Sequence, residues 1–244
     1  MPDHRDTSPP DEPVSEQTLE EMKTYYRERA AEYNEWFYRQ GRYDLGPEMN
    51  ARWFRELEVV REELRALQVT GDVLELAPGT GIWTEYFLRT ATSLTAVDAS
   101  PEMIAINRAR VGDGRVVYVQ ADLFTWQPSR SFDAVCFCFW ISHIPLERLP
   151  AFLRTVAQAL RPGGKVFFVD GRREPGTTAV DQVLPGEREQ VMLRKLNDGR
   201  EFSIVKNFYD PAWLAAQCAA AGLAITLKET PACFLYGYGT RSEL

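Results

Sequence analysis

From Gly71 onward, short apolar runs alternate with amphipathic stretches, and this alternation constrains the fold more than any other feature of the chain. The apolar runs are typical of buried strands, and the stretches between them are typical of helices. Strands that alternate with helices pair in parallel, so the pattern predicts an α/β fold with a doubly wound sheet. The predicted strands are 73–77, 94–97, 116–119, 132–139 and 165–169, and the helices are 82–90, 101–110 and 149–160.

The two ends of the chain complete this organisation. Two more strands are predicted at 202–206 and 234–238, with a helix at 211–221 between them. Residues 1–15 are rich in proline and charge and predict a disordered tail. Residues 16–70 are helical in pattern, with a first helix that ends near Gly41 and a second that follows Gly46. The first helix carries one continuous apolar stripe of Leu19, Met22, Tyr26, Ala30, Tyr33 and Phe37.

A glycine turn follows the first predicted strand, in the segment from Glu75 to Gly81. Glycines such as Gly79 and Gly81 let the backbone approach a ligand closely, and open α/β sheets bind cofactors at this point. The dinucleotide fingerprint would need a third glycine at position 84, where Thr84 stands, and no Gly-Lys-Ser/Thr follows for a phosphate loop. The turn therefore indicates a cofactor of another kind. The other interpretation is a tight turn without a ligand.

Acidic residues lie at the ends of the next two predicted strands. Asp98 stands where an acidic side chain accepts hydrogen bonds from ribose hydroxyls. Asp122 stands where a carboxylate can accept from the exocyclic amine of an adenine, with Leu123 and Met103 against the ring faces. Glu75 lies inside the first strand, where a carboxylate is costly unless paired, so it either holds the glycine turn or meets an ammonium. The other interpretations are a helix N-cap for Asp98 and a plain loop carboxylate for Asp122.

Four segments, 73–81, 97–103, 120–122 and 160–166, together resemble the class I, Rossmann-like S-adenosylmethionine-dependent methyltransferases, and are similar to stand-alone bacterial small-molecule members. The resemblance implies a seven-stranded, mostly parallel sheet with an antiparallel last strand. It also implies N-terminal lid helices at 16–70 and an S-adenosylmethionine-binding domain at 71–244. One departure is Ala77-Pro78, where many members have Gly-Cys or Gly-Ser, and we expect it to alter the loop without removing the cofactor.

The resemblance also implies a set of residues that bind S-adenosylmethionine. In the lid, Tyr26 and Tyr33 are expected to face the cofactor or the substrate, and the other interpretation of that helix is core packing. The full predicted set is Tyr26, Tyr33, Glu75, Ala77, Gly79, Gly81, Trp83, Asp98, Ala99, Met103, Asp122, Leu123 and Phe139.

His143 follows the fourth strand, in a loop that borders the sulfonium and the acceptor in the family that the chain resembles. A histidine there can take a proton from a hydroxyl or amine, so it is the predicted catalytic residue. A structural histidine is the alternative. Trp140 and Arg172 are the predicted substrate-binding residues, and Arg172 with its neighbour Arg173 suits an anionic acceptor. Core packing for Trp140 and a solvated charge cluster for the arginines are the other interpretations.

Composition narrows the partners. The net charge of −7 argues against a nucleic-acid or anionic-membrane partner, and no apolar run has the roughly 20 residues that a membrane span needs. The N-terminus lacks the apolar core of a signal peptide, and four cysteines with two histidines and no CxxC pair fit a cytoplasmic protein without a metal site.

The predicted function is methyl transfer from S-adenosylmethionine to an oxygen, nitrogen or carbon atom of a small molecule, in a setting such as bacterial secondary metabolism. The alternatives are a protein or RNA methyltransferase, a non-catalytic S-adenosylmethionine-binding protein, and a nicotinamide-dependent oxidoreductase. The missing third glycine and the lack of a Tyr-x-x-x-Lys pair count against the last. The acceptor and the oligomeric state stay open.

Overall fold

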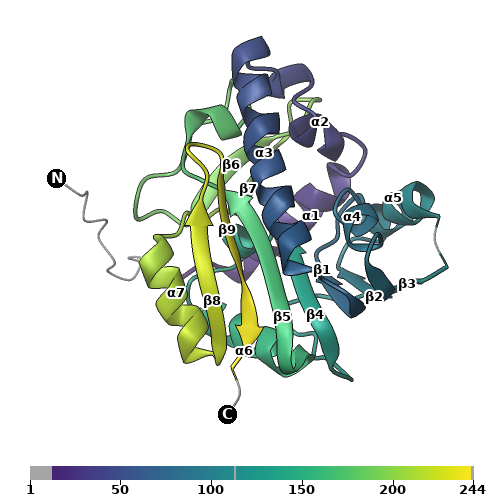
Figure 1. Cartoon of the computed structure of the whole chain (residues 1–244). Helices are drawn as coiled ribbons and strands as arrows, with labels where there is room; N and C mark the ends of the chain where they lie inside the picture. The colour runs from purple at the N-terminus through teal and green to yellow at the C-terminus, as the bar shows by residue number, and fades with distance from the viewer. Residues whose placement is uncertain (1–12, 113, 243–244) are drawn as a thin grey trace.

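The computed structural model describes residues 13–112 and 114–242, so the predicted tail of residues 1–15 lies almost wholly outside the described residues. A sheet of seven strands runs through the molecule in the order β3-β2-β1-β4-β5-β9-β8 (Figure 1). The first five strands pair in parallel, whereas β9 pairs antiparallel with both β5 and β8. This confirms the predicted α/β fold. The strands are β1 (Gly71–Leu76), β2 (Ala91–Asp98), β3 (Val116–Gln120), β4 (Phe132–Cys138), β5 (Leu160–Gly171), β8 (Leu223–Glu229) and β9 (Phe234–Arg241).

Helices cover both faces of the sheet, because successive side chains of a buried strand point to opposite sides and both sides are apolar. On one face, α6 (Leu149–Ala159) and α7 (Pro211–Ala220) pack on Leu74, Val135 and Phe168. On the other face, α3 (Pro47–Leu67) and the short α4 (Thr84–Phe87) pack on Val73, Cys136 and Phe167. The helix α5 (Pro101–Val111) follows β2 and contacts β2, β3 and α4.

The N-terminal helix is broken, which corrects the prediction of one continuous helix up to Gly41. It forms α1 (Glu16–Glu28) and α2 (Tyr33–Phe37), separated by turns at 29–32. The apolar stripe does not serve a single surface. Its first part, with Leu19 and Met22, packs on a separate two-stranded sheet, whereas Phe37 enters the core around α3. A straight helix could not reach both surfaces, so the chain bends between them.

The separate sheet is a pair formed by β6 (Val191–Lys195) and β7 (Glu201–Val205). The strand predicted at 202–206 therefore exists but does not join the main sheet, and that part of the prediction is wrong. Its place in the main sheet is taken by β8, which the sequence analysis missed. As an edge strand, β8 buries only Leu223 fully, so it gives no continuous apolar run.

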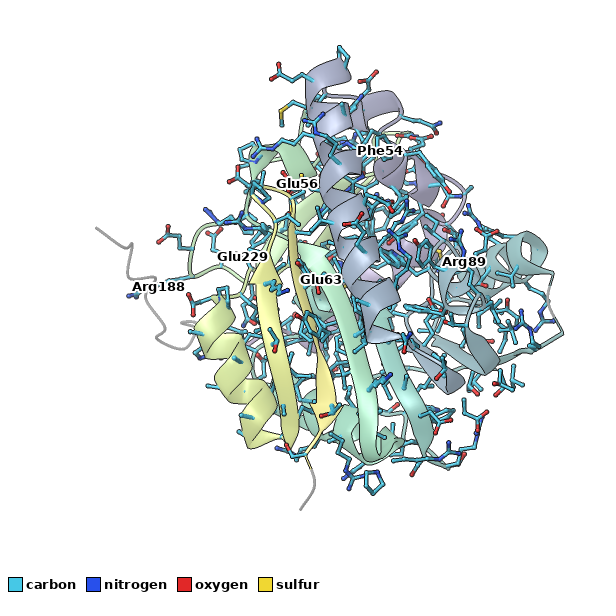
Figure 2. The ribbon with its side chains drawn as sticks, viewed as in Figure 1. Phe54, Glu56, Glu63, Arg89, Arg188 and Glu229 are labelled. Carbon is cyan, nitrogen blue, oxygen red and sulfur yellow. The ribbon has the colours of Figure 1, made fainter. Side chains whose placement is uncertain are left out.

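The helix α3 is fixed to the β8–β9 connection by a buried carboxylate. Glu56 accepts hydrogen bonds from the Thr230 hydroxyl and from the N–H groups of Ala232 (3.0 Å) and Cys233 (2.7 Å). Despite burial, these hydrogen bonds hold the pKa of Glu56 at about 2. Further along the same helix, Glu63 pairs with Lys228 of β8 at 2.6 Å (Figure 2). The helix α3 is therefore held to the sheet, and it contributes no residue to the cavity at the carboxyl ends of the strands.

No helix among the described residues has the length and apolar character needed to cross a membrane. Nor does the described part of the chain gather three or more histidine, cysteine or acidic side chains that could hold a metal ion.

Candidate active site

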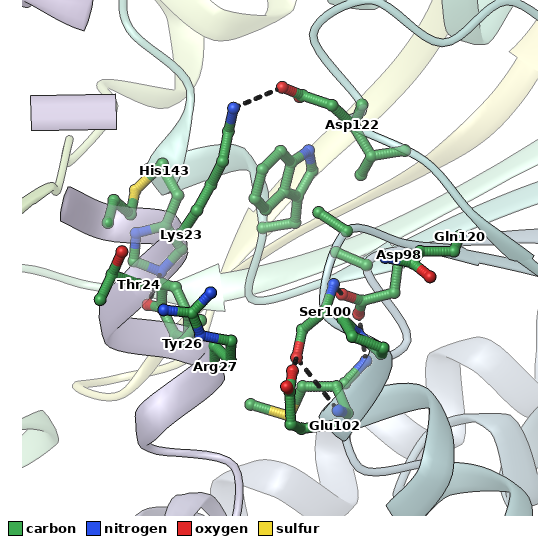
Figure 3. Close-up of a pocket in the computed structure, with 18 of the residues that line it drawn as sticks. Lys23, Thr24, Tyr26, Arg27, Asp98, Ser100, Glu102, Gln120, Asp122 and His143 are labelled. Carbon is green, nitrogen blue, oxygen red and sulfur yellow. Dashed lines mark hydrogen bonds and ion pairs between the residues drawn. The ribbon is translucent and has the colours of Figure 1, made fainter. Parts of the chain in front are cut away.

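A cavity of about 390 Å³ lies at the carboxyl ends of the parallel strands, with α1 as its outer wall (Figure 3). Its other walls are the loops that follow β1, β2, β3 and β4. Ligand sites of open α/β sheets occupy this edge, and their volumes are about 300–1,000 Å³. The cavity brings together most of the predicted site residues, namely Tyr26, Tyr33, Ala77, Gly79, Asp98, Ala99, Met103, Asp122, Leu123, Phe139, Trp140 and His143.

The glycine turn forms the floor of this cavity. Gly79 has a left-handed backbone with φ of 54°, and its N–H donates to Asp98 Oδ2 at 3.1 Å. Gly81 does not line the cavity but meets α5, because a Cβ atom there would lie 2.9 Å from the side chain of Asn107. Asn107 in turn donates to the carbonyl of Gly79 and to the Thr84 hydroxyl. Gly79 therefore lines the cavity, whereas Gly81 allows α5 to pack closely against the turn.

Two residues without the freedom of glycine also hold left-handed conformations at the rim. Ala77 has φ of 52° and Phe139 has φ of 58°, and each directly follows a strand of the sheet. Left-handed backbone is unfavourable for residues with a Cβ atom. Such conformations concentrate at functional sites, where the surrounding structure enforces them. Ala77, which stands where many members of the family that the chain resembles have glycine, therefore adopts a backbone conformation that suits glycine.

Asp98 braces the loops around the cavity. Its carboxylate accepts from the N–H of Gly79 and from that of Ser100 at 2.9 Å, and burial raises its pKa to about 6. The N-cap of α5 is Ser100, whose hydroxyl accepts from Met103 N–H at 3.1 Å. The alternative role of helix cap thus falls to Ser100, and Asp98 is left facing the cavity.

Asp122 is tied to the wall formed by α1. Its Oδ2 atom lies 2.6 Å from Lys23 Nζ, and its Oδ1 atom accepts from Phe124 N–H at 2.9 Å (Figure 3). Lys23, Thr24 and other α1 residues line the cavity but were absent from the predicted site. A lysine on the polar side of an amphipathic helix carries no signal in the sequence that it faces a ligand.

His143 is buried and engages both of its ring nitrogens. Nδ1 lies 2.7 Å from the carbonyl oxygen of Val205, which can only accept, so Nδ1 carries the proton. Nε2 then accepts from the Tyr26 hydroxyl at 2.8 Å. Burial, reinforced by the charge of Lys206, lowers the pKa of His143 to about 3. The ring is therefore neutral at physiological pH and joins α1 to β7.

Behind His143 lies a buried ion pair. Lys206 Nζ is 3.0 Å from Asp170 Oδ1 and donates to Ser142 Oγ at 2.7 Å. The N–H of Ser142 donates to the other oxygen of Asp170 at 3.0 Å. Although burial opposes it, the Lys206 charge lowers the pKa of Asp170 below its usual range. This pair fixes the loop that carries Trp140 and His143.

Glu75 and Trp83 lie in a separate cavity of about 20 Å³ beside the glycine turn, which shares Tyr33, Ala77 and Phe139 with the larger one. Within the described residues, Glu75 Oε2 and Trp83 Nε1 are buried atoms without a hydrogen-bond partner. Burial raises the pKa of Glu75 to about 8. A buried carboxyl and an unpaired indole N–H beside so small a space suit a single small polar group.

Arg172 was predicted to bind the substrate, but it lines neither cavity. Its side chain pairs with Glu229 at 3.0 Å and donates to the carbonyl oxygens of Thr230 and Pro231. The guanidinium instead fastens the end of β5 to the β8–β9 connection, which is the reason that it is unavailable to a substrate.

Comparisons with known proteins agree with this geometry. Residues 48–228 match a family described as methyltransferase domain. A ubiquinone biosynthesis O-methyltransferase of Xanthomonas euvesicatoria pv. vesicatoria is 33% identical over 159 residues, which are 63% of this chain and 62% of that protein. The chain thus spans about three fifths of the length of the curated relatives that it matches.

Solved structures give the same result over more of the chain. A complex of DhpI with SAH covers 95% of this chain and 100% of that chain, with a TM-score of 0.75 and 37% sequence identity. The N-methyltransferase NodS from Bradyrhizobium japonicum covers 91% and 100%, with a TM-score of 0.63, but at 14% identity it shows the fold alone.

The residues present fit the adenosyl cofactor of this family. Carboxylates at the ends of two strands offer acceptors to hydroxyl and amine groups, and the glycine turn leaves room at the centre of the edge. Glu75 adds an unpaired oxygen beside that turn. The chain belongs to the methyltransferase-domain family and is an S-adenosylmethionine-dependent methyltransferase.

Proposed function

We propose that the enzyme methylates a small molecule at an oxygen, nitrogen or carbon nucleophile. The observation that carries the proposal is a cavity roofed by α1 and walled by aromatic side chains, including Tyr26, Phe124 and Trp140. Concave, mostly apolar cavities with a few polar groups suit small ligands. The name of the Xanthomonas relative, an O-methyltransferase of ubiquinone biosynthesis, supports a small acceptor.

In this proposal, each end of the cofactor has its own partners. Asp98 accepts from the ribose hydroxyls, and Asp122 accepts from the adenine amine between Leu123 and Met103. Glu75 meets the ammonium of the methionine end, with the unpaired indole N–H of Trp83 close to the carboxylate. S-adenosylmethionine supplies a methyl group that its sulfonium already activates.

The residues of this chain then have to orient the acceptor and exclude water, and alignment of this kind can lower a barrier by several kcal/mol. Tyr26 and Trp140 bound the space next to His143. Because its pKa is low, His143 is a weak base. We therefore propose that His143 contributes mainly by fixing the Tyr26 hydroxyl at the reacting centre, with proton acceptance limited to acceptors that lose a proton during the attack.

The test separates cofactor binding from acceptor choice. Calorimetry with S-adenosylmethionine and S-adenosylhomocysteine first checks that the protein binds both. A bacterial extract is then divided by dialysis, and the release of S-adenosylhomocysteine is measured with each fraction. We expect turnover with the dialysable fraction and none from an Asp98→Ala variant. Turnover with the retained macromolecules alone would replace this proposal by a protein or RNA methyltransferase, and binding without any turnover would favour a non-catalytic role.

A further inference from the structure

The hydrogen bond between Tyr26 and His143 has a fixed direction. The carbonyl oxygen of Val205 can only accept, so the Nδ1 atom of His143, 2.7 Å away, holds the proton of the neutral ring. The Nε2 atom is then unprotonated, and the Tyr26 hydroxyl at 2.8 Å has to donate to it. The one proton of that hydroxyl is therefore used, and only the lone pairs of its oxygen stay available to a ligand.

The surroundings of His143 keep this direction from reversing. The other neutral tautomer would point two acceptors, Nδ1 and the Val205 carbonyl oxygen, at each other. A doubly protonated ring would make Nε2 a donor, but His143 is only 6% exposed, and burial opposes a charged imidazole. The ammonium of Lys206, which is bonded to the adjacent residue Ser142, opposes it further. The imidazole therefore accepts from Tyr26 and does not donate to it.

This hydrogen bond lies at the wall of the cavity, which both residues line (Figure 3). Among the described residues, His143 is the hydrogen-bond partner of the Tyr26 hydroxyl, and no N–H or O–H group donates to its oxygen. The adjoining wall is aromatic, since the ring centroids of Phe124 and Trp140 are 5.7 Å apart and Trp140 lies 6.4 Å from His143. The indole N–H of Trp140 is buried within the wall. A ligand that reaches this place therefore meets an acceptor oxygen among aromatic side chains.

The charges that line the cavity disfavour an anionic ligand. More carboxylates than cations line it, namely Glu20, Asp98, Glu102 and Asp122 against Lys23 and Arg27. The Lys23 ammonium is already bonded to Glu20 at 2.7 Å and to Asp122 at 2.6 Å. S-adenosylmethionine is a cation, with a sulfonium and an ammonium against one carboxylate, so its charge suits this lining. An anionic methyl acceptor would instead meet an excess of like charge.

We propose that the group methylated by this enzyme is a neutral hydroxyl or amine that donates its O–H or N–H to the Tyr26 oxygen. This inference rests on the proposed function, which it narrows from any small molecule to one whose reacting group is a hydrogen-bond donor. Donation to Tyr26 uses the proton of that group and leaves a lone pair on its oxygen or nitrogen. A carboxylate or an ether has no such proton and cannot make this contact.

The experiment uses calorimetry to measure the binding of four small probes to the protein saturated with S-adenosylhomocysteine. Phenol and aniline carry an O–H and an N–H donor, whereas anisole has the same ring without a donor and benzoate is an anion. We expect phenol or aniline to bind at least about fivefold more tightly than anisole, because only they can donate to Tyr26. Benzoate should bind no better than anisole. The donor that binds more tightly identifies the acceptor as a hydroxyl or an amine compound.

Two variants test the direction of the Tyr26–His143 hydrogen bond. In Tyr26→Phe, which removes the acceptor oxygen and keeps the ring, the Kd of the preferred donor should rise to near that of anisole. In His143→Leu, the Tyr26 proton is released, so the hydroxyl can donate as well as accept. The Kd of anisole divided by that of the preferred donor should then fall at least about threefold. This ratio is used because the room left by the smaller side chain affects both probes.

The matched control is Tyr25→Phe. Tyr25 precedes Tyr26 on α1, but its hydroxyl accepts from Arg29 at 2.9 Å and it does not line the cavity. Its replacement should leave the preference among the probes as it is. Binding of anisole or benzoate as tight as that of the donors, no binding of either donor, or an unchanged donor Kd in Tyr26→Phe would each overturn the inference. A protein that fails to bind S-adenosylhomocysteine at all would instead refute the proposed function.

Discussion

At the scale of single residues, two ionisable side chains of the site are neutral because they are buried, and one residue with a Cβ atom has a left-handed backbone. Burial raises the pKa of Glu75 to about 8, so the carboxyl keeps its proton, and it lowers the pKa of His143 to about 3, so the imidazole is unprotonated. Ala77 holds a backbone conformation that suits glycine. Each departs from the state that it would adopt in water, and each therefore has a measurable signature.

Because the pKa of Glu75 is raised, we expect the free energy of unfolding to fall as the pH rises. The pKa is about 8 in the folded protein against an ordinary value of 4.5, so the folded state holds the proton more tightly than the unfolded chain. The stabilisation is complete below about pH 4.5 and is lost as the pH rises through 8. We expect Glu75→Gln to remove this slope, which urea denaturation of both proteins between these pH values will measure. Parallel profiles for the two proteins would rule out a buried, protonated Glu75.

The Ala77 signature is a gain in stability from a glycine. Since the left-handed conformation is unfavourable by roughly 1–2 kcal/mol for residues with a Cβ atom, Ala77→Gly should stabilise the fold by about 1 kcal/mol. Ala121→Gly, at a position without positive φ, is the control and should destabilise it. Denaturant midpoints give the comparison. A loss of stability in Ala77→Gly would show that the methyl group packs well enough to outweigh the strain.

The Tyr26–His143 pair should behave as a unit in catalysis. We expect Tyr26→Phe and His143→Ala each to lower kcat at least about tenfold, the equivalent of a lost 1.4 kcal/mol in the transition state. Binding of S-adenosylhomocysteine should change less. The double variant should lose little more than either single one, because the two side chains share one hydrogen bond. Fully additive losses would mean that His143 acts on the acceptor independently of Tyr26.

At the scale of elements, the wall of the cavity is a helix held by polar contacts to distant segments. The α1 residue Glu21 accepts from Ser203 N–H of β7, and Lys23 pairs with Asp122. If adenine uses the same Asp122 oxygen, Lys23 has to give it up. Lys23→Met should then bind S-adenosylhomocysteine several-fold more tightly in calorimetry, with Lys165→Met as a distant control. Weaker binding would mean that the pair closes α1 over the cofactor.

The sequence predicted the elements whose pattern is decided locally. The parallel strands are continuous apolar runs, and the strand-end aspartates follow from the motifs, so both could be found without a structure. The break between α1 and α2 depends on two separate packing surfaces, and β8 is half exposed, so neither has a local signal. Lys23 was missed for the same reason, because only tertiary contacts bring it to the site.

At the scale of the whole molecule, cofactor binding should stabilise the fold, because the cavity joins loops from four strands and α1. At a ligand concentration of about 100 times Kd, the gain is about 2.7 kcal/mol. For a chain of 244 residues, this corresponds to a melting temperature higher by roughly 5–10 °C. Differential scanning calorimetry with S-adenosylhomocysteine measures it. The shift should be smaller in Asp98→Asn, and an equal shift would remove Asp98 from the binding residues.

The contact between Lys23 and Asp122 has one more consequence, for the response to ionic strength. Dissolved ions weaken the partly exposed Lys23–Asp122 ion pair far more than they weaken a hydrogen bond from the uncharged adenine amine to Asp122. The adenosyl group of the cofactor would therefore displace Lys23 from Asp122 more easily at high salt concentration. The enzyme would then bind its methyl donor more tightly as salt is added, which is the opposite of the usual response of a ligand that is held by exposed ion pairs.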